Sequence, residues 1–332
     1  MSEKIDFLAI GDLVIDAFIE LKDAHVHCNI DTEGCELCLR FGDKVPYESV
    51  DIVPAVGNSP NASVAASRLG LKSALIASVG GDQNGQDCIT SLKKDGVDTE
   101  FVKIEKDKLT NYHYVLRYGA ERTILVKHTE FSYSLPKDLP EIGWVYLSSL
   151  ADNSEEFHNE ISEFLKNHPE TKLAFQPGTF QISLGVEKLK EIYKRTEVFC
   201  CNKEEAQRIL KTEETDIKKL ITSIHELGPK IVCITDGPKG AYASDQNEVL
   251  FTPMYPDIAP PVDRTGAGDA FASTFTIALI YGKSISDALT WGPINSMMVV
   301  QYVGAQEGLL SKEKLEDYLK IAPEDYRIQK LS

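Results

Sequence analysis

Residues 263–271 read Asp-Arg-Thr-Gly-Ala-Gly-Asp-Ala-Phe, and an apolar run continues from there to Tyr281. Glycines let the backbone approach a ligand closely, and the apolar run predicts a helix that begins at this turn. The free N–H groups and the dipole of a helix N-terminus attract anions. The segment therefore predicts an anion site in which Asp269 stays ionised and accepts a proton from a hydroxyl group. A simpler interpretation is a chain reversal with Asp269 as the helix cap.

The composition indicates a folded chain with an acidic excess. Its 332 residues hold 35 basic and 51 acidic side chains, which gives a formal net charge of −16. This length suffices for one large core with a small appendage. The charge repels nucleic acid and anionic lipid, so we expect neither as a partner. A local loop of backbone amides can still bind an anionic substrate.

The sequence also predicts the cellular compartment of the protein and the redox state of its cysteines. The first residues lack a basic segment followed by a long apolar stretch, and the apolar run 270–281 is shorter than the roughly 20 residues that span a bilayer. We therefore expect a cytoplasmic protein. Seven cysteines, an odd number in a chain this long, predict reduced thiols and no disulfide framework.

One cysteine-rich stretch invites a metal interpretation. It contains His25, His27, Cys28, Cys35 and Cys38, and the last two have the spacing of half a zinc site. No second pair follows at the usual interval, and Cys38 also falls in an alternating run that is typical of a strand. We therefore do not expect structural zinc there.

Short β-rich runs alternate with segments of helical periodicity along most of the chain. This alternation predicts an α/β fold with a parallel sheet covered by helices on both faces. The expected strands are 6–11, 73–79, 144–147, 172–175, 198–201 and 230–235. The expected helices are 61–69, 85–94, 154–167, 187–194, 203–211, 217–227, 267–281 and 284–302.

Two stretches depart from this alternation. The first, between residues 16 and 58, has alternating runs but no good helix, and the second predicts a hairpin that turns at 118–121. Together they predict a small β-sheet that forms a lid beside the α/β body. The predicted lid comprises 16–58 and 106–127, and the predicted main body comprises 1–15, 59–105 and 128–332. Because a small sheet has exposed edges, we also expect a homodimer that forms through the lid.

The turn at 263–271 resembles the C-terminal signature of the ribokinase/PfkB family of carbohydrate and nucleoside kinases, Asp-Thr-x-Gly-Ala-Gly-Asp-x-Phe. Arg264 replaces the usual Thr. Residues 57–62, Gly-Asn-Ser-Pro-Asn-Ala, resemble the family's substrate-binding segment, although Val56 replaces its first glycine. Residues 202–205 are similar to its Asn-x-x-Glu motif, and residues 235–240 are similar to its Thr-x-Gly-x-x-Gly loop.

Each short motif also has a purely structural interpretation. Asn202 and Glu205 fit a helix capping box, and Gly237 and Gly240 fit a hairpin turn. Their occurrence in the family's order, together with the early Asp16, favours the family over chance.

The resemblance implies a ribokinase-like three-layer α/β/α fold with a mostly parallel central sheet and a small β-sheet lid. It also implies ATP-dependent phosphorylation of a sugar hydroxyl, with Asp269 as the general base and the amides of Gly266, Ala267 and Gly268 as the anion hole. The residues expected to bind the acceptor are Asp16, Gly57, Asn58, Asn61 and Arg117. The residues expected to bind the nucleotide are Asn202, Thr235, Gly237, Gly240 and Asn295. Glu205 is expected to organise Mg²⁺ through water, and Asp263 and Thr265 to lie beside a monovalent cation such as K⁺.

Three alternatives stay open. A nucleoside kinase needs an apolar platform for the base, which the sequence does not locate. A sugar-phosphate kinase of the phosphofructokinase type needs basic residues for the acceptor phosphate, and Arg117, Arg122 and Lys127 on the second lid piece either serve that purpose or simply face solvent. A non-catalytic sugar or nucleotide sensor on the same fold would not need Asp269 beside its glycines.

Overall fold

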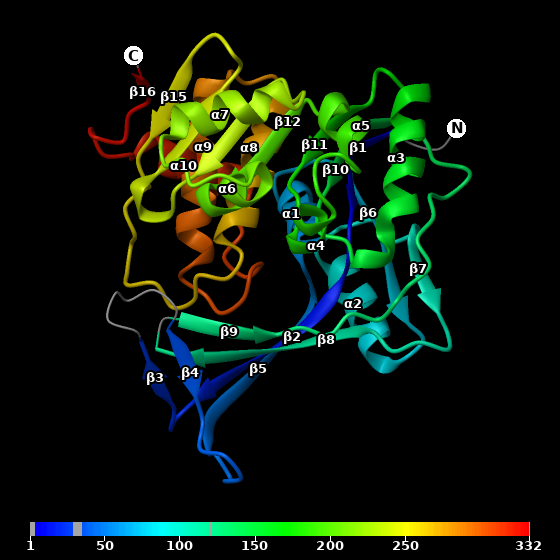
Figure 1. Cartoon of the computed structure of the whole chain (residues 1–332), viewed down its shortest axis with the longest axis vertical. Helices are drawn as coiled ribbons and strands as arrows, with labels where there is room; N and C mark the ends of the chain where they lie inside the picture. The colour runs from blue at the N-terminus through cyan, green and yellow to red at the C-terminus, as the bar shows by residue number, and fades with distance from the viewer. Residues whose placement is uncertain (1–3, 29–34, 120, 332) are drawn as a thin grey trace.

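The computed structural model describes residues 4–28, 35–119 and 121–331. Its main body contains one ten-stranded sheet with helices on both faces (Figure 1). The strands of this sheet are β1 Ile5–Ile10, β6 Ser73–Gly80, β7 Val102–Glu105, β10 Ile142–Leu147, β11 Lys172–Phe175, β12 Val198–Asn202, β13 Ile231–Thr235, β14 Ala241–Ser244, β15 Val249–Thr252 and β16 Gln329–Leu331. Their order is β16-β15-β14-β13-β12-β11-β10-β1-β6-β7, and the pairs from β13 to β7 are parallel. The predicted mostly parallel sheet is confirmed, with an antiparallel edge from β13 to β16.

Two apolar cores cover the two faces of this sheet. The helices are α1 Asn58–Arg68, α2 Gln83–Lys94, α3 Glu155–Asn167, α4 Thr179–Leu184, α5 Lys190–Arg195, α6 Lys203–Leu210, α7 Ile217–Glu226, α8 Ala267–Ile280, α9 Ile285–Val299 and α10 Lys312–Lys320. Successive side chains of strand β1 enter the two cores in turn. Phe7 and Ala9 belong to the core with α1, α8 and α9. Leu8 and Ile10 belong to the core with α3, α5 and α7. A strand buried on both faces explains the continuous apolar runs in the sequence.

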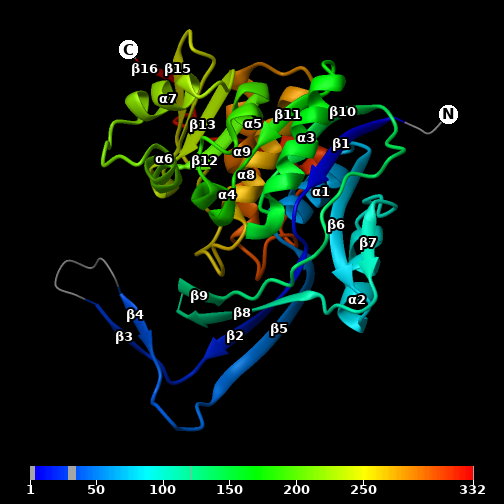
Figure 2. The same cartoon turned by 45° about the vertical axis from the view of Figure 1, so that its right-hand side comes forward.

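The small sheet is a separate four-stranded unit in the order β5-β2-β8-β9 (Figure 2). Its strands are β2 Val14–Leu21, β5 Tyr47–Val56, β8 Asn111–Tyr118 and β9 Glu121–Leu125. The predicted hairpin is confirmed by the pairing of Tyr118 with Glu121, while Ala120 of its turn lies outside the described residues. One face of β2 packs toward the main body, since Phe18 is buried and lies near Gly304.

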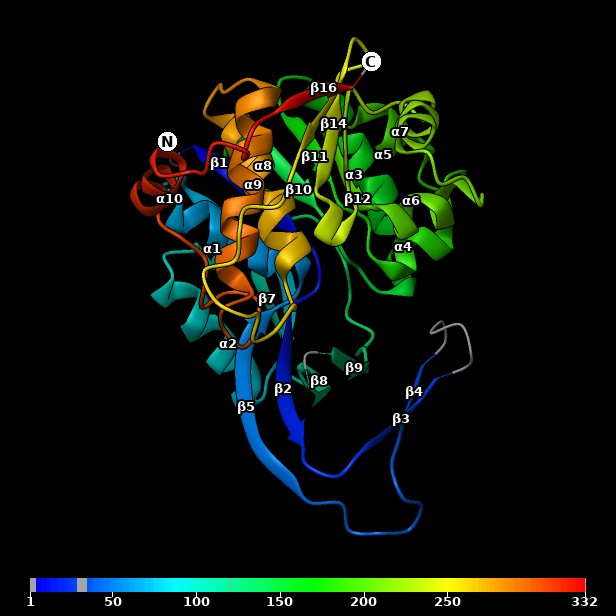
Figure 3. The ribbon, with the colours of Figure 1, turned by 90° about the vertical axis from the view of Figure 1, so that its left-hand side faces the viewer.

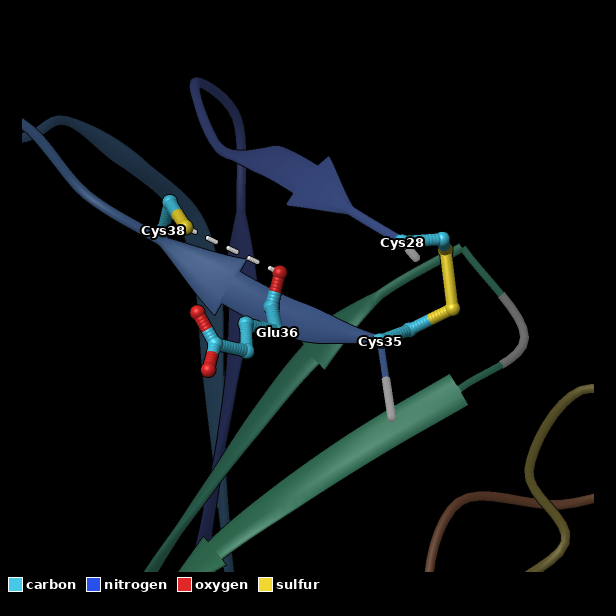
Figure 4. Close-up of a disulfide and its surroundings, with 4 residues drawn as sticks. All are labelled: Cys28, Cys35, Glu36 and Cys38. Atoms are coloured by element: carbon cyan, nitrogen blue, oxygen red, sulfur yellow. Dashed lines mark hydrogen bonds between the residues drawn. A yellow bond between two sulfur atoms is a disulfide. The ribbon is translucent and has the colours of Figure 1, made fainter. Parts of the chain in front are cut away.

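A two-stranded ribbon, β3 His25–His27 and β4 Glu36–Cys38, extends beyond the small sheet (Figure 3). Its antiparallel register pairs His27 with Glu36, so the next facing residues are Cys28 and Cys35. Their Cα atoms lie 4.1 Å apart, and a disulfide joins them (Figure 4). The expectation of seven reduced thiols is therefore wrong for this pair. The residues alone did not show it because an alternating pattern does not fix which positions of two strands face each other.

The remaining cysteines of the described chain are free, and most of them are buried. Among the described residues, no three His, Cys, Asp or Glu side chains are grouped so as to hold a metal ion. In the same part of the chain, no helix has both the length and the apolar character needed to cross a bilayer.

Candidate active site

Two adjoining cavities lie at the carboxyl ends of the parallel strands. The inner cavity, about 340 Å³, is bounded by the ends of β11, β12 and β13, the starts of α1 and α8, and strand β9 of the lid. The outer cavity, about 320 Å³, lies between the loop after β13, the segment after β15 and helices α8 and α9. They share Thr235, Arg264, Gly268 and Phe271. Open α/β sheets bind ligands at this edge.

The loop before α8 is shaped by Asp263, which is buried. Its Oδ1 accepts hydrogen bonds from the backbone N–H of Thr265 at 3.0 Å and from the Thr265 hydroxyl at 2.8 Å. Its Oδ2 accepts from the backbone N–H of Gly304 at 3.0 Å. Both carboxylate oxygens thus hold the loop in place.

Gly266 occupies a position that other residues cannot adopt without strain. Its φ is 79°, and a Cβ atom there would lie 2.2 Å from the Cβ of Ala305. Gly266 is the N-cap of α8, and no side chain caps this helix. The simpler interpretation, in which Asp269 caps the helix, therefore does not hold. The open N-terminus faces the two cavities through Gly266, Ala267 and Gly268.

The Asp269 carboxylate instead accepts hydrogen bonds from three side-chain amides. Asn58 donates to Oδ1 at 2.7 Å, Asn61 donates to Oδ2 at 2.8 Å and Gln176 donates to Oδ1 at 3.0 Å. Burial raises the pKa of Asp269, and the amides and the charge of Arg122 oppose that rise. The result is a fixed carboxylate at the inner cavity whose pKa is above its ordinary value.

A second hydrogen bond fixes the side-chain amide of Asn61. Its Oδ1 accepts a hydrogen bond from Gln306 Nε2 at 2.9 Å, and the same nitrogen donates to the Ala55 carbonyl at 2.7 Å. Gly57 starts α1 with φ 120°, and a Cβ there would lie 2.7 Å from the Asp12 carbonyl oxygen. The segment 57–62 therefore places two amides on Asp269 through a close approach that requires glycine.

Asn202 and Glu205 form a helix capping box, which is the structural interpretation that the sequence allowed beside a role in the site. Asn202 Oδ1 accepts from the Glu205 N–H, and Glu205 Oε2 accepts from the Asn202 N–H, both at 2.8 Å. Both residues also line the inner cavity. Burial raises the pKa of Glu205, and the negative charge of Asp269 adds to the rise. The capping role and the cavity position thus coexist.

The outer cavity contains the glycines of the loop after β13. Thr235 ends β13 opposite Asn202, and Gly237 and Gly240 line the cavity beyond it. The apolar side chains in its wall include Pro253, Met254, Tyr255, Met297 and Val300. This cavity is therefore apolar on one side and opens to the α8 N-terminus on the other.

Asn295 and Arg117, two of the expected residues, make their contacts elsewhere and line neither cavity. Asn295 is fully buried, where its Nδ2 donates to Thr274 Oγ1 and its Oδ1 accepts from the Leu310 N–H. Arg117 lies 3.5 Å from Glu20 and donates to the Val262 carbonyl at 3.0 Å. Its cross-strand neighbour Arg122 lines the inner cavity instead.

Asp16 belongs to a buried ionisable cluster between lid and body. Its Oδ1 lies 3.5 Å from His113 Nδ1, and Asp12 Oδ2 lies 3.7 Å from His128 Nδ1. The two imidazole rings meet edge to face at 5.4 Å. Burial raises the pKa of Asp12 to about 6 and lowers the pKa of His128. The cluster thus places carboxylate and imidazole groups, which suit hydroxyl ligands, at the root of the lid.

Sequence reasoning missed most of this cluster and also missed Gln176. Gln176 directly follows β11, and a polar residue at the carboxyl end of a parallel strand was the available signal. Asp12 lies two residues beyond the end of β1 and carries a similar signal. His113 and His128 had no such signal, because their proximity depends on the lid register.

The chain is similar to known proteins over most of its length. The family model described as pfkB family carbohydrate kinase matches residues 27–312. Ribokinase from Bacillus subtilis is 27% identical over 288 residues, which cover 84% of this chain and 92% of that protein. Nucleoside kinase from Methanothermobacter thermautotrophicus is 24% identical over 323 residues, which cover 93% of this chain and 94% of that protein.

Solved structures share the fold of this chain. Arabidopsis thaliana ribokinase, solved with ribose and ATP, superposes with a TM-score of 0.78 at 18% identity and covers 96% of this chain and 99% of its own. The predicted ribokinase-like architecture is confirmed. Because the family model spans most of the sequence, the chain belongs to the pfkB family of carbohydrate kinases.

Proposed function

We propose that this protein transfers the γ-phosphoryl group of ATP to a hydroxyl of a sugar, with Asp269 as the general base. The observation that carries the proposal is the fixed carboxylate of Asp269, which faces the inner cavity beside Gly266 and Gly268. A carboxylate held by three donors beside an open helix N-terminus suits proton transfer next to a phosphoryl group.

We place ATP in the outer cavity. The apolar wall that includes Met254, Tyr255 and Met297 suits an adenine ring. The phosphates would then follow the loop with Gly237 and Gly240 toward the N-terminus of α8, where backbone N–H groups and the helix dipole favour negative charge. The bond to the leaving ADP oxygen therefore lies near the shared wall of the two cavities.

The transfer step follows from this placement. The attacking hydroxyl gives its proton to Asp269 as its oxygen bonds to phosphorus and the bond to the ADP oxygen breaks. The raised pKa of Asp269 makes it a better proton acceptor than an exposed carboxylate. The amides of Gly266, Ala267 and Gly268 stabilise the charge on the transferring group.

The inner cavity suits a magnesium ion. Glu205 and Asp269 both line it, and burial raises the pKa of each carboxyl group, so a divalent cation would balance charge there. Glu205, which Asn202 fixes by hydrogen bonds, is proposed to hold Mg²⁺ through a water molecule. The ion would neutralise phosphate charge. Asp263 and Thr265 shape the neighbouring loop, and we place the proposed K⁺ site beside them.

The acceptor is proposed to lie beneath the lid, between the amides of Asn58 and Asn61 and the cluster around Asp16. That cluster holds four buried polar atoms without a hydrogen-bond partner among the described residues: Asp12 Oδ2, Asp16 Oδ1, His113 Nε2 and His128 Nδ1. Buried polar groups of this kind are costly unless they are satisfied, and sugar hydroxyls both donate and accept. These atoms therefore favour a polyhydroxy acceptor.

The experiment is ADP release by the purified protein with Mg·ATP over ribose, fructose, fructose 6-phosphate, 2-keto-3-deoxygluconate, adenosine, inosine and cytidine. We expect turnover at least tenfold above the background ATP hydrolysis with one or more sugars. Turnover with nucleosides alone would favour nucleoside kinase activity. No stimulated ADP release with any acceptor would contradict the proposal and favour a sensor.

A homodimer through the lid is part of the proposal. Tyr114 and Leu125 are exposed on the outer face of the lid sheet, and Val50 and Ile52 are exposed on its edge strand β5. Exposed apolar strands beside unpaired edges favour pairing with a second copy. Light scattering that gives the monomer mass at assay concentrations would contradict this assembly.

A further inference from the structure

Arg122 lies on the inner face of the lid sheet. In the hairpin, Arg122 pairs with Arg117 and Ile124 pairs with Val115. In the neighbouring strand pair, Val115 pairs with Phe18. Facing residues of neighbouring strands point to the same side of a sheet, so Arg122 and Ile124 share the face on which Phe18 is buried. This face looks toward the main body.

The side chain of Arg122 reaches the inner cavity. Arg122 and Ile124 are the lid residues among those that line it, together with Asp269, Gly266 and Gly268. The charge of Arg122 acts on Asp269 and lowers its pKa. The guanidinium group is therefore close to the carboxylate proposed as the base.

The guanidinium groups of Arg122 and Arg117 differ in their hydrogen bonding. The Nε atom of Arg122 is buried and has no hydrogen-bond partner among the described residues. Arg117, by contrast, contacts Glu20 and the Val262 carbonyl. A buried N–H of a charged group without an acceptor costs free energy, which an incoming acceptor atom would recover.

The charges around the inner cavity point to the kind of acceptor atom. The ionisable carboxyl groups that line it are Glu205 and Asp269, and the basic groups are Arg122 and Arg264. Arg264, which replaces the usual Thr of the family signature, also lines the outer cavity. One guanidinium thus approaches from the lid and one from the loop before α8. A guanidinium fork matches the paired oxygens of phosphate and carboxylate groups.

We propose that Arg122 binds an oxyanion in the inner cavity, where its guanidinium adds a lid-borne positive charge to the amides of the α8 N-terminus. This inference rests on the proposed function and deepens it. Two sources supply the same chemistry: the phosphoryl group in transfer, or a phosphate or carboxylate carried by the acceptor. In either case Arg122 touches a reacting or bound group and is not only a structural residue of the lid.

The binding test uses inorganic phosphate as the probe, titrated by calorimetry into the full-length protein saturated with Mg·ADP. The variants are Arg122→Ala and Arg122→Lys, with Lys127→Ala as the control. Lys127→Ala removes the same charge from an exposed lid position that lines neither cavity. We expect about 10- to 100-fold weaker phosphate binding in Arg122→Ala, the range of one charge-assisted contact, and partial rescue by lysine.

The control variant should bind phosphate within about twofold of wild type, as exposed charges do. Equal phosphate affinity in wild type and Arg122→Ala would overturn the inference. An equal loss of phosphate affinity in Lys127→Ala would also overturn it, because the general electrostatic field of the lid would then explain the effect. So would a wild-type protein that binds no phosphate.

The kinetic test separates the two sources. If Arg122 binds the phosphoryl group in transfer, Arg122→Ala lowers kcat for neutral and anionic acceptors alike. If it binds an anionic group of the acceptor, KM rises only for acceptors such as fructose 6-phosphate. Unchanged kcat and KM with both classes would overturn the inference. Should the wild-type protein release no ADP with any acceptor, the proposed function fails and the phosphate titration still decides the role of Arg122.

Discussion

Asn61 Nδ2 donates a hydrogen bond to Asp269 Oδ2 at 2.8 Å, although 208 positions separate the two residues in the chain. The contact joins the start of α1 to the first turn of α8. Gln306 holds the other end of the same amide. The segment that precedes α1 and the segment that precedes α8 therefore act as one unit around the proposed base.

Asn61→Ala should lower kcat by about 10- to 100-fold, because Asp269 loses a donor that orients its carboxylate. The loss should also raise the pKa of Asp269 further, since this hydrogen bond lowers it. The base must be ionised to act, so the acid limb of the kcat profile should move to higher pH. Asn159→Ala, at an exposed position of α3, is the control. An unmoved acid limb would argue against the contact.

Gly266→Ala should destabilise the fold. Its φ of 79° is unfavourable for alanine, and the new Cβ would meet Ala305 at 2.2 Å. We expect a loss of about 1–3 kcal/mol in the free energy of unfolding, measured with urea. Gly268→Ala is the matched control, since a Cβ there meets no atom within 4 Å. Equal unfolding midpoints for the two variants would contradict the role assigned to Gly266.

Asp12→Asn should stabilise the protein at neutral pH but not in acid. Burial raises the pKa of Asp12 from 3.8 to about 6, so the folded state holds more protons than the unfolded state between these values. Stability contributed by this group therefore falls as pH rises through that window, and the whole penalty is present above it. At 1.36 kcal/mol per pKa unit the penalty is about 3 kcal/mol.

Asparagine carries no such penalty, and its side-chain oxygen can still accept the Tyr133 hydroxyl that bonds Asp12 at 2.6 Å. Urea unfolding of the two proteins at pH 4 and pH 8 checks the prediction. A gain that is as large at pH 4 as at pH 8 would show that titration of Asp12 is not the cause.

The Cys28–Cys35 disulfide predicts that two of the seven thiols resist labelling. Alkylation of the unreduced, denatured protein should add five labels by mass spectrometry, and prior reduction should raise this to seven. Seven labels without reduction would mean that the pair is a dithiol in the purified protein.

The parts of the site that lie on one short segment were predictable from the sequence. The turn at Gly266 and the carboxylate of Asp269 occur within one helix start, where local backbone rules apply. The capping box of Asn202 and Glu205 is local in the same way. Strand and helix alternation likewise predicted the parallel sheet, because its strands are buried on both faces.

The remaining features depend on which strands meet and in what register. His113 faces Asp16 only through the parallel pairing of β2 and β8, and Cys28 faces Cys35 only through the ribbon register. Arg122 and Arg117 lie opposite each other in one hairpin, yet only Arg122 lines the inner cavity. Asn295 is expected at the nucleotide, whereas its amide hydrogen-bonds the Thr274 hydroxyl and the Leu310 N–H inside the core. Long-range contacts of this kind leave no local pattern.

The central claim is that Asp269 is the base, and the most direct test is the turnover of Asp269→Asn with whichever acceptor the panel identifies. Asparagine keeps the size of the side chain but cannot take the proton. We predict a fall in kcat of about 10² or more with the dissociation constant for ADP within about twofold of wild type. Turnover close to that of wild type would contradict the assignment of Asp269 and the mechanism built on it.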